Sequence, residues 1–318
     1  MGKECQTAAV TPCTNPQQGQ PLLCMPLLSC ALSASRRCLL PGARRCFSHQ
    51  PPSFSLGYVF DIDGVLLRGN VPLEGARASL KSLLAARVPF IFLTNGGGEL
   101  ESSKAAKLSK LLDLPVHPAQ VVLSHTPMKP LCQQLGSARV LVLGCRDVLG
   151  VARSYGLTTV DTPMCLLKDE PSRYPFIQVE QRRALAHRDE PFAAVLVLHD
   201  PNSWGLELQV VLDVLRGGVP LGSGMQQSVP YIASNADLTF AGAHSVPRLA
   251  GGAFTTALHA MWAATHPGGG PLTTRFFGKP CVSSLPPCAD SSPLTVAHTP
   301  QASILYSLPP PVQHKRNV

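Results

Sequence analysis

Apolar runs alternate with amphipathic stretches in the first part of the chain, and this alternation limits the fold more than any other feature. The runs Tyr58–Asp61, Pro89–Asn95 and Gln120–Ser124 are typical of buried strands. Apolar residues at helical spacing fill Glu74–Arg87 and Glu99–Leu114 between them. The order β-α-β-α-β with short connections predicts a parallel, doubly wound α/β sheet, in which ligands bind beyond the carboxyl ends of the strands.

The same pattern restarts at about Leu131 and continues toward residue 265. The expected strands are Ala138–Gly144, Phe192–Asp200 and Pro230–Phe240, and the expected helices are Arg146–Tyr155, Leu206–Arg216 and Ala250–Thr265. We interpret this second α/β unit as an insertion within the first.

Polar residues stand where two of the first strands end. Asp61 and Asp63 follow the first strand, and Thr94 and Asn95 follow the second, so all four are expected at one crevice. A buried carboxylate costs several kcal/mol or more unless it has a partner, which a metal ion and a phosphate would supply. An EF-hand loop is excluded, because Val65–Leu67 stand where further oxygen ligands are needed. Thr94-Asn95 alone would be read as a turn that ends a strand.

Three spaced motifs together resemble the haloacid dehalogenase superfamily. They are Asp61-Ile62-Asp63-Gly64, Thr94-Asn95 and Gly278-Lys279-Pro280, and the resemblance covers roughly residues 55–280. The long insertion before the third motif is similar to that of the C2-capped phosphatases. The resemblance implies a HAD-like Rossmannoid parallel sheet with an inserted α/β C2 cap domain.

The resemblance also implies the roles of the two aspartates. Asp61 matches the nucleophile that attacks phosphorus and forms an aspartyl-phosphate. Asp63 matches the acid that protonates the leaving oxygen and later activates water. The family cofactor is Mg²⁺, for which the expected ligands are Asp61 and the backbone carbonyl of Asp63.

The other motif residues would position the phosphate. Thr94 is expected to hydrogen-bond a phosphoryl oxygen, with the backbone N–H of Asn95 as a second donor. Gly64 would let the backbone turn beneath the phosphate, and Lys279 would balance the charge of nucleophile and phosphate. Phosphoryl transfer depends mostly on such positioning and electrostatic stabilisation. Lys279 considered alone would be read as a solvated loop lysine.

The fourth family motif, acidic residues on a later strand that complete the metal site, has no match. The only acid after Lys279 is Asp290, and prolines interrupt the intervening residues. We therefore expect the C-terminal core strands to be missing and Mg²⁺ affinity to fall. The strand at Tyr58–Asp61 would become an exposed sheet edge that lowers stability and favours association. The ending has the character of a truncated or alternatively spliced form.

The sequence predicts five segments along the chain. They are a mitochondrial transit peptide (1–47), a first part of the core (55–130), a C2-type cap (131–245), a return segment of the core (246–280) and a Pro-rich disordered tail (281–318). The leader has four arginines and no acid between Glu4 and Asp61, and cleavage is expected between Phe47 and Ser48. We therefore expect a soluble protein of the mitochondrial matrix. The alternative interpretations of the leader are a secretory signal and a disordered arm.

The net charge of +8 does not indicate nucleic-acid binding. Residues 1–60 carry five Lys/Arg and one Glu, so half of the excess lies in the leader, and aromatic residues are only 6%. No apolar run reaches the ~20 residues of a membrane span. Six of the eleven cysteines precede residue 47, and their spacing favours reduced thiols over disulfides or zinc. The oligomeric state is not readable, and a homodimer stays open.

The favoured function is Mg²⁺-dependent hydrolysis of a small phosphorylated metabolite, impaired by the missing fourth motif. The substrate is not specified, and sugar phosphates, nucleotides and phospholipid precursors of the phosphoglycerol type all remain open. The alternatives are a catalytically inactive mitochondrial binding or regulatory protein, and an unstable splice product without function.

Overall fold

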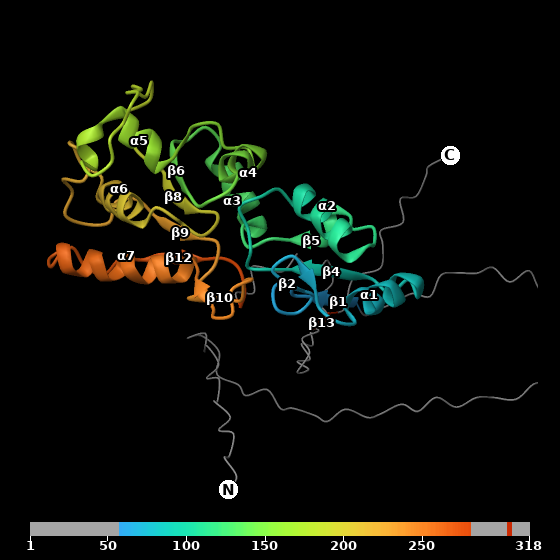
Figure 1. Ribbon diagram of the computed structural model, residues 1–318. Helices are drawn as coiled ribbons and strands as arrows, with labels where there is room; N and C mark the ends of the chain where they lie inside the picture. The colour runs from blue at the N-terminus through green and yellow to red at the C-terminus, as the bar shows by residue number, and fades with distance from the viewer. Residues whose placement is uncertain (1–56, 281–303, 307–318) are drawn as a thin grey trace, which may run out of the picture. The chain divides into compact units, whose positions relative to one another are not determined.

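Two mainly parallel sheets organise the protein in the computed structural model, which describes residues 57–280 and 304–306 of the 318-residue chain (Figure 1). The transit peptide expected over residues 1–47 lies outside the described residues. The first sheet has the strand order β13-β1-β4-β5 and the second has the order β12-β9-β8-β6-β7. Both units expected from the alternating pattern are therefore present as α/β folds.

The first sheet is built from the predicted strands. It contains β1 (Gly57–Phe60), β4 (Phe90–Leu93), β5 (Val121–Val122) and β13 (Ile304–Tyr306). Strands β1, β4 and β5 are parallel. Helices α1 (Ala76–Ala85) and α2 (Glu101–Leu112) connect them. Both helices pack on the same face, in a cluster with Phe60, Phe92 and Leu108, so in the described part of the chain this sheet is not wound on both sides.

Strand β13 corrects the expectation of an exposed edge at β1. Its backbone pairs antiparallel with β1, so that Tyr58 lies opposite Leu305. The prolines of residues 281–318 predict disorder, but a short stretch without proline can still pair with the unpaired N–H and C=O groups of an edge strand. The rest of that tail lies outside the described residues.

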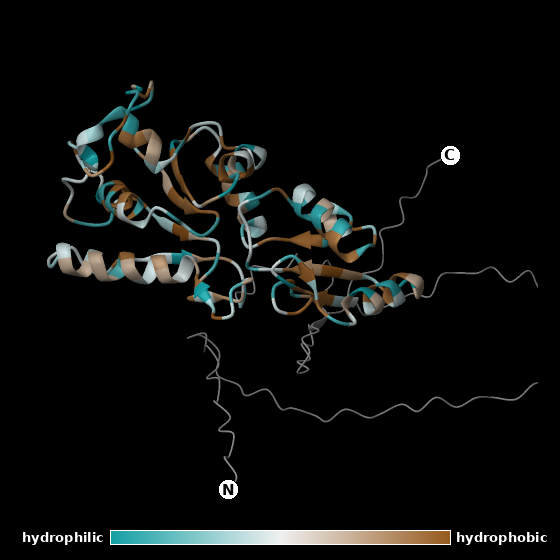
Figure 2. Cartoon of the chain, in the orientation of Figure 1, coloured by the Kyte–Doolittle hydropathy of each residue, from teal (hydrophilic) through white to brown (hydrophobic). Residues whose placement is uncertain are grey.

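The second sheet is fully parallel and is covered by helices on both faces. It contains β6 (Val140–Leu143), β7 (Val160–Asp161), β8 (Ala194–Val197), β9 (Tyr231–Ala233) and β12 (Thr274–Phe276). Helices α5 (Pro163–Asp169), α6 (Trp204–Arg216) and α7 (Gly251–Thr265) pack on one face. Helices α3 (Lys129–Leu135) and α4 (Val148–Ser154) pack on the other. Figure 2 shows the apolar strands within these layers.

Strand β12 differs from the expected boundary of the return segment, which we placed at residues 246–280. Thr274 lies opposite Tyr231, so β12 is an edge strand of the second sheet rather than part of the first. The physical reason lies in α7, whose Phe254 and Trp262 are buried against this sheet and bring the chain back parallel to β9. The return to the first sheet therefore begins only after Phe276.

Short elements complete the described chain. Two hairpins are formed by β2 (Leu67–Arg68) with β3 (Val71–Pro72), and by β10 (Thr239–Phe240) with β11 (Arg248–Leu249). Single 3₁₀ turns occupy Pro118–Gln120, Thr126–Met128 and Pro171–Arg173. In the described part of the chain, none of the helices combines the length and apolar character that a membrane crossing requires.

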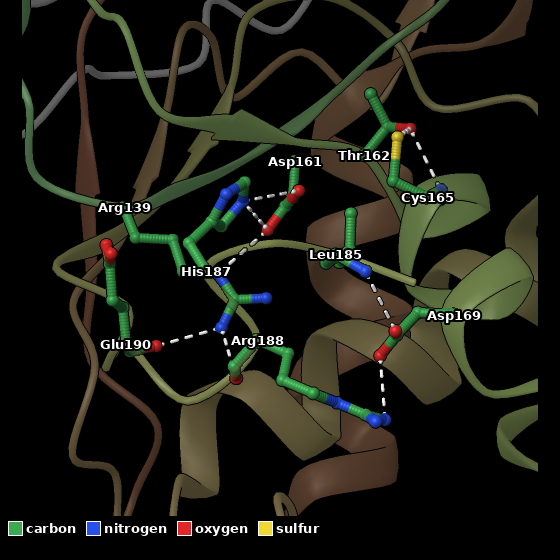
Figure 3. A network of polar contacts seen from close by, with 9 residues as sticks. All are labelled: Arg139, Asp161, Thr162, Cys165, Asp169, Leu185, His187, Arg188 and Glu190. Carbon is green, nitrogen blue, oxygen red and sulfur yellow. Dashed lines mark hydrogen bonds and ion pairs between the residues drawn. The ribbon is translucent and has the colours of Figure 1, made fainter. Parts of the chain in front are cut away.

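A buried ion pair fastens the edge of the second sheet (Figure 3). Arg139 Nε donates to Asp161 Oδ2 at 2.8 Å, and both side chains are at most 4% exposed. Arg139 Nη1 also donates to the carbonyl oxygens of Arg188 and Glu190, each at 2.8 Å. His187 Nε2 lies 3.1 Å from Asp161 Oδ1. These contacts attach the loop before β8 to strands β6 and β7.

Candidate active site

The turn after β1 points both aspartates of the first motif out of the core. Ile62 between them is fully buried, whereas Asp61 and Asp63 are partly exposed, as the twofold period of an extended chain requires. The backbone N–H of Ile62 donates to Asp61 Oδ1 at 2.8 Å. The turn then closes through the N–H groups of Leu66 and Leu67, which donate to the Ile62 carbonyl.

Gly64 shapes this turn but does not line the cleft described below. Its φ of +86° lies in the left-handed region that glycine adopts without strain, and its N–H donates to the Leu67 carbonyl at 2.7 Å. Gly64 is expected to let the backbone turn beneath the phosphate, and the structure shows this turn, one residue away from the lining Asp63.

The turn after β4 brings Thr94 to Asp63. Thr94 is only 2% exposed, and its Oγ1 accepts from the Gly96 N–H at 2.9 Å. The same hydroxyl donates to Asp63 Oδ2 at 3.3 Å. One hydroxyl thus holds the second turn and faces the carboxylate of the first motif.

Asn95 joins the end of β4 to the segment that carries Lys279. Its side-chain Oδ1 accepts from the Lys279 N–H at 2.8 Å, and its Nδ2 donates to the Lys279 carbonyl at 3.1 Å. Nδ2 also donates to Asp237 Oδ2 at 2.9 Å. The expected role of the Asn95 backbone N–H toward phosphate stays a prediction. The structure shows a further role that the sequence does not predict, in which the side-chain amide holds the Lys279 backbone on two sides, as a clamp.

Lys279 reaches the first motif through this clamp. Its Nζ lies 2.8 Å from Asp61 Oδ1, and the side chains of Lys279 and Asp61 are 25% and 36% exposed. Gly278 precedes it with a φ of +72°, and a Cβ there would collide with the Ser234 carbonyl. The close approach of the two segments therefore requires glycine.

The motif residues line one large cleft, with a volume of about 1550 Å³. Asp61, Asp63, Thr94, Asn95 and Lys279 all contribute to its wall. The structure therefore brings together every residue singled out for catalysis, together with Asn95.

Polar residues of the second unit also line the cleft, and among them Asn235, Asp237 and Asp200 are not predicted from the sequence. Asn235 Nδ2 donates to the Asn95 carbonyl at 3.2 Å, and its Oδ1 accepts from the Asp237 N–H at 3.1 Å. Asp200 Oδ1 accepts from the Gly251 N–H, at the start of α7, at 2.7 Å. The stretch "SNADLTF" and the Asp after β8 were the available signals, since both follow strands of the second sheet at their carboxyl ends.

Burial and neighbouring groups perturb the second unit's side of the cleft. Burial raises the pKa of Asp200, and the charge of Asp237 acts in the same direction, while the Gly251 N–H partly offsets both. His199 also lines the cleft, and burial lowers its pKa to about 4, so it is neutral at physiological pH. Within residues 57–280, no group of three His, Cys, Asp or Glu side chains is arranged to hold a metal ion.

Comparison with known proteins places this geometry in a family. Residues 58–158 match the family model described as haloacid dehalogenase-like hydrolase. The mitochondrial hydrolase YKR070W of Saccharomyces cerevisiae is 33% identical over 244 residues, which are 73% of this chain and 68% of the relative. A cardiolipin synthase (CMP-forming) / mitochondrial hydrolase fusion protein of Schizosaccharomyces pombe is 32% identical over 245 residues, 73% of this chain and 40% of that protein.

A solved structure shows the same fold. The "possible sugar phosphatase, HAD superfamily" of Cytophaga hutchinsonii superimposes with a TM-score of 0.51 at 18% identity, covering 74% of this chain and 70% of its own. The chain belongs to the haloacid dehalogenase-like hydrolases, as a member with a C2-type cap.

Proposed function

We propose that this chain hydrolyses small phosphate monoesters through a phosphorylated Asp61. The observation that carries the proposal is the approach of Lys279 Nζ to Asp61 Oδ1 at 2.8 Å. An ammonium group beside the carboxylate would attract the dianionic phosphate and offset the negative charge when the two meet. Thr94, beside Asp63, is placed to donate a hydrogen bond to a phosphoryl oxygen once substrate displaces its present contact.

Two displacements make up the reaction. In the first, Asp61 Oδ attacks phosphorus, the bond from phosphorus to the ester oxygen breaks, and the carboxyl of Asp63 gives that oxygen its proton. In the second, a water molecule attacks the same phosphorus, its proton passes to the Asp63 carboxylate, and the bond to Asp61 breaks. Inorganic phosphate and the alcohol are the products, and Asp63 has its proton back.

Mg²⁺ is the cofactor of this proposal, and the described residues fit it only in part. Mg²⁺ is usually held by one or two carboxylates together with the substrate phosphate. Asp61 and Asp63 line the cleft, but the described part of the chain offers no cluster of three ligating side chains. When bound, Mg²⁺ would neutralise phosphate charge. We therefore infer weak metal binding that depends on phosphate, and slow turnover.

The relatives suggest a location and a substrate class. Two of them are named mitochondrial hydrolases, which supports mitochondrial import through residues 1–47. The matrix is the compartment that we propose for the imported protein. One joins its hydrolase to a cardiolipin synthase, which favours a glycerol-based phospholipid precursor among the open substrates. Cleavage between Phe47 and Ser48 after import into isolated mitochondria would test the location.

The activity is tested with the full chain, Mg²⁺ and p-nitrophenyl phosphate. Asp61→Asn and Asp63→Asn should each abolish turnover, while Asp113→Asn, an exposed aspartate outside the cleft, should not change it. Trapping of ³²P on the protein should require Asp61. Turnover that survives Asp61→Asn would refute the proposal. Phosphate binding by calorimetry without any turnover would instead support a binding or regulatory protein.

A further inference from the structure

Exposed apolar side chains gather on two hairpins of this molecule. In the described part of the chain, twelve large hydrophobic residues are exposed, and six of them lie in the segments 67–73 and 238–249. We call these two segments the rim. The six are Val71, Leu73, Leu238, Phe240, Val246 and Leu249. Single exposed hydrophobic residues are ordinary, but a contiguous group marks an interaction surface.

The two hairpins of the rim touch each other. A Cβ built on Gly69 would lie 3.2 Å from the Cβ of Ala243, so the tips of β2–β3 and β10–β11 are in van der Waals contact. The two hairpins that carry the six apolar residues are therefore adjacent, although they come from distant parts of the chain.

The rim also contributes to the wall of the cleft. Gly69, Phe240, Arg248 and Leu249 line the cleft together with Asp61 and the other motif residues. A partner that covers the rim therefore lies next to the cleft that contains Asp61.

The rim carries positive charge, which favours an anionic partner. Arg68 and Arg248 are exposed, and His244 is exposed in the loop of the second hairpin. Neither rim segment contains an acid, and the nearest acids along the chain, Glu74 and Asp237, border the two segments. Neither arginine forms an ion pair with any residue that the structure describes. Apolar residues next to unpaired cations fit the interface of an anionic bilayer. A symmetric contact between two rims would offer these cations no acid from either rim segment.

We propose that the rim docks on the surface of an anionic phospholipid bilayer and places the cleft at the level of the headgroups. The docking itself does not depend on catalysis. The identity of the substrate rests on the proposed function: if the docked protein is a phosphatase, its substrate is a phosphate monoester carried by a lipid rather than a freely dissolved metabolite.

Vesicle sedimentation with the full chain tests the docking. The probes are vesicles of phosphatidylcholine alone and of phosphatidylcholine mixed with phosphatidylglycerol. Val71→Ser combined with Val246→Ser should weaken binding to the anionic vesicles roughly tenfold. The matched control replaces Phe176 and Met225, which are 82% and 67% exposed outside the rim, by serine and should bind like the parent chain. All variants retain the Arg-containing leader, so the leader cannot cause a difference.

Charge reversal is the second test. Arg68→Glu should reduce binding to anionic vesicles and leave the weak binding to phosphatidylcholine unchanged, and added salt should reduce binding of the parent chain. Circular dichroism checks that each variant folds. Equal binding of the rim and control variants would overturn the proposal. So would a rim variant that changes only the mass measured by analytical ultracentrifugation, which would assign the rim to contacts between copies.

Failure of the docking is separable from failure of the catalytic proposal. Vesicle binding is measured without turnover, and Asp61→Asn should bind vesicles like the parent chain. Normal turnover of p-nitrophenyl phosphate without rim-dependent binding would refute the docking alone. Rim-dependent binding without turnover would refute the catalytic proposal alone.

Discussion

Lys279 Nζ and Asp61 Oδ1 lie 2.8 Å apart, although the two residues come from opposite ends of the continuous described segment. The backbone of Lys279 is held on both sides by the Asn95 amide, so the position of its ammonium group is tied to the end of β4. The site therefore forms only when β1, β4 and the return from β12 are all in place.

Replacing Lys279 by methionine should reduce kcat/KM for p-nitrophenyl phosphate by roughly 10²–10³-fold, because the ammonium group would stabilise charge that develops in the transition state. The fold should be retained, because this side chain is partly exposed and its backbone contacts remain. Steady-state kinetics measures the loss. Lys81→Met, at an exposed ion pair with Asp113, is the matched control and should leave kcat/KM unchanged. An unimpaired Lys279→Met enzyme would contradict this role.

Asn95 should act through Lys279. Asn95→Ala removes three side-chain hydrogen bonds and should lower the free energy of unfolding by about 1–3 kcal/mol. It should also lower kcat/KM at least about tenfold in the parent chain, but much less in a Lys279→Met background, because coupled residues are not additive. Denaturant titration and kinetics measure both effects. Gln209→Ala, on the exposed face of α6, is the control. Equal losses in both backgrounds would show that Asn95 acts independently.

Much of the site could be predicted because ligands of a parallel α/β sheet bind beyond the carboxyl ends of its strands. Asp61 and Thr94 each follow a buried strand, and the structure places both at one cleft with Lys279. The contributions of Asn235 and Asp237 were missed, because their meaning depends on how the second sheet approaches β4, which no local pattern encodes.

The sequence does not predict which segments pair with the edge strands of the two sheets. Strand β13 has only three residues, and its pairing with β1 is determined by a free edge and not by its own periodicity. Strand β12 was absorbed into the return segment for the same reason, since Thr274–Phe276 gives too short a signal. The long, periodic elements such as α6 and α7 were predicted nearly at their observed bounds.

Acid should destabilise the protein through two buried histidines. Burial lowers the pKa of His125 to about 4, against the opposing charge of Glu101, and burial with the charge of Arg146 lowers that of His199 to about 4. The unfolded chain binds these protons near pH 6.5, whereas the native protein does not. Stability is therefore complete above pH 6.5 and is lost as the pH falls toward 4, by about 3 kcal/mol for each histidine.

Urea titrations across this pH range measure the effect. His125→Gln and His199→Gln should each flatten the dependence of the unfolding free energy on pH between 6.5 and 4. His244→Gln, at an exposed position, should leave the slope unchanged. Slopes that are the same in all three variants would contradict the assignment.

Removing one partner of the Arg139–Asp161 ion pair should lower the free energy of unfolding more than removing both charges together. Arg139→Met leaves the carboxylate of Asp161, which is 2% exposed, with His187 as its one remaining side-chain partner among the described residues. Breaking a buried pair in this way costs about 3–5 kcal/mol. Adding Asp161→Asn to Arg139→Met should recover part of that loss, because no unpaired buried charge remains. A double-mutant cycle by denaturant titration measures the coupling, and two single losses that simply add would show that the pair contributes no interaction of its own.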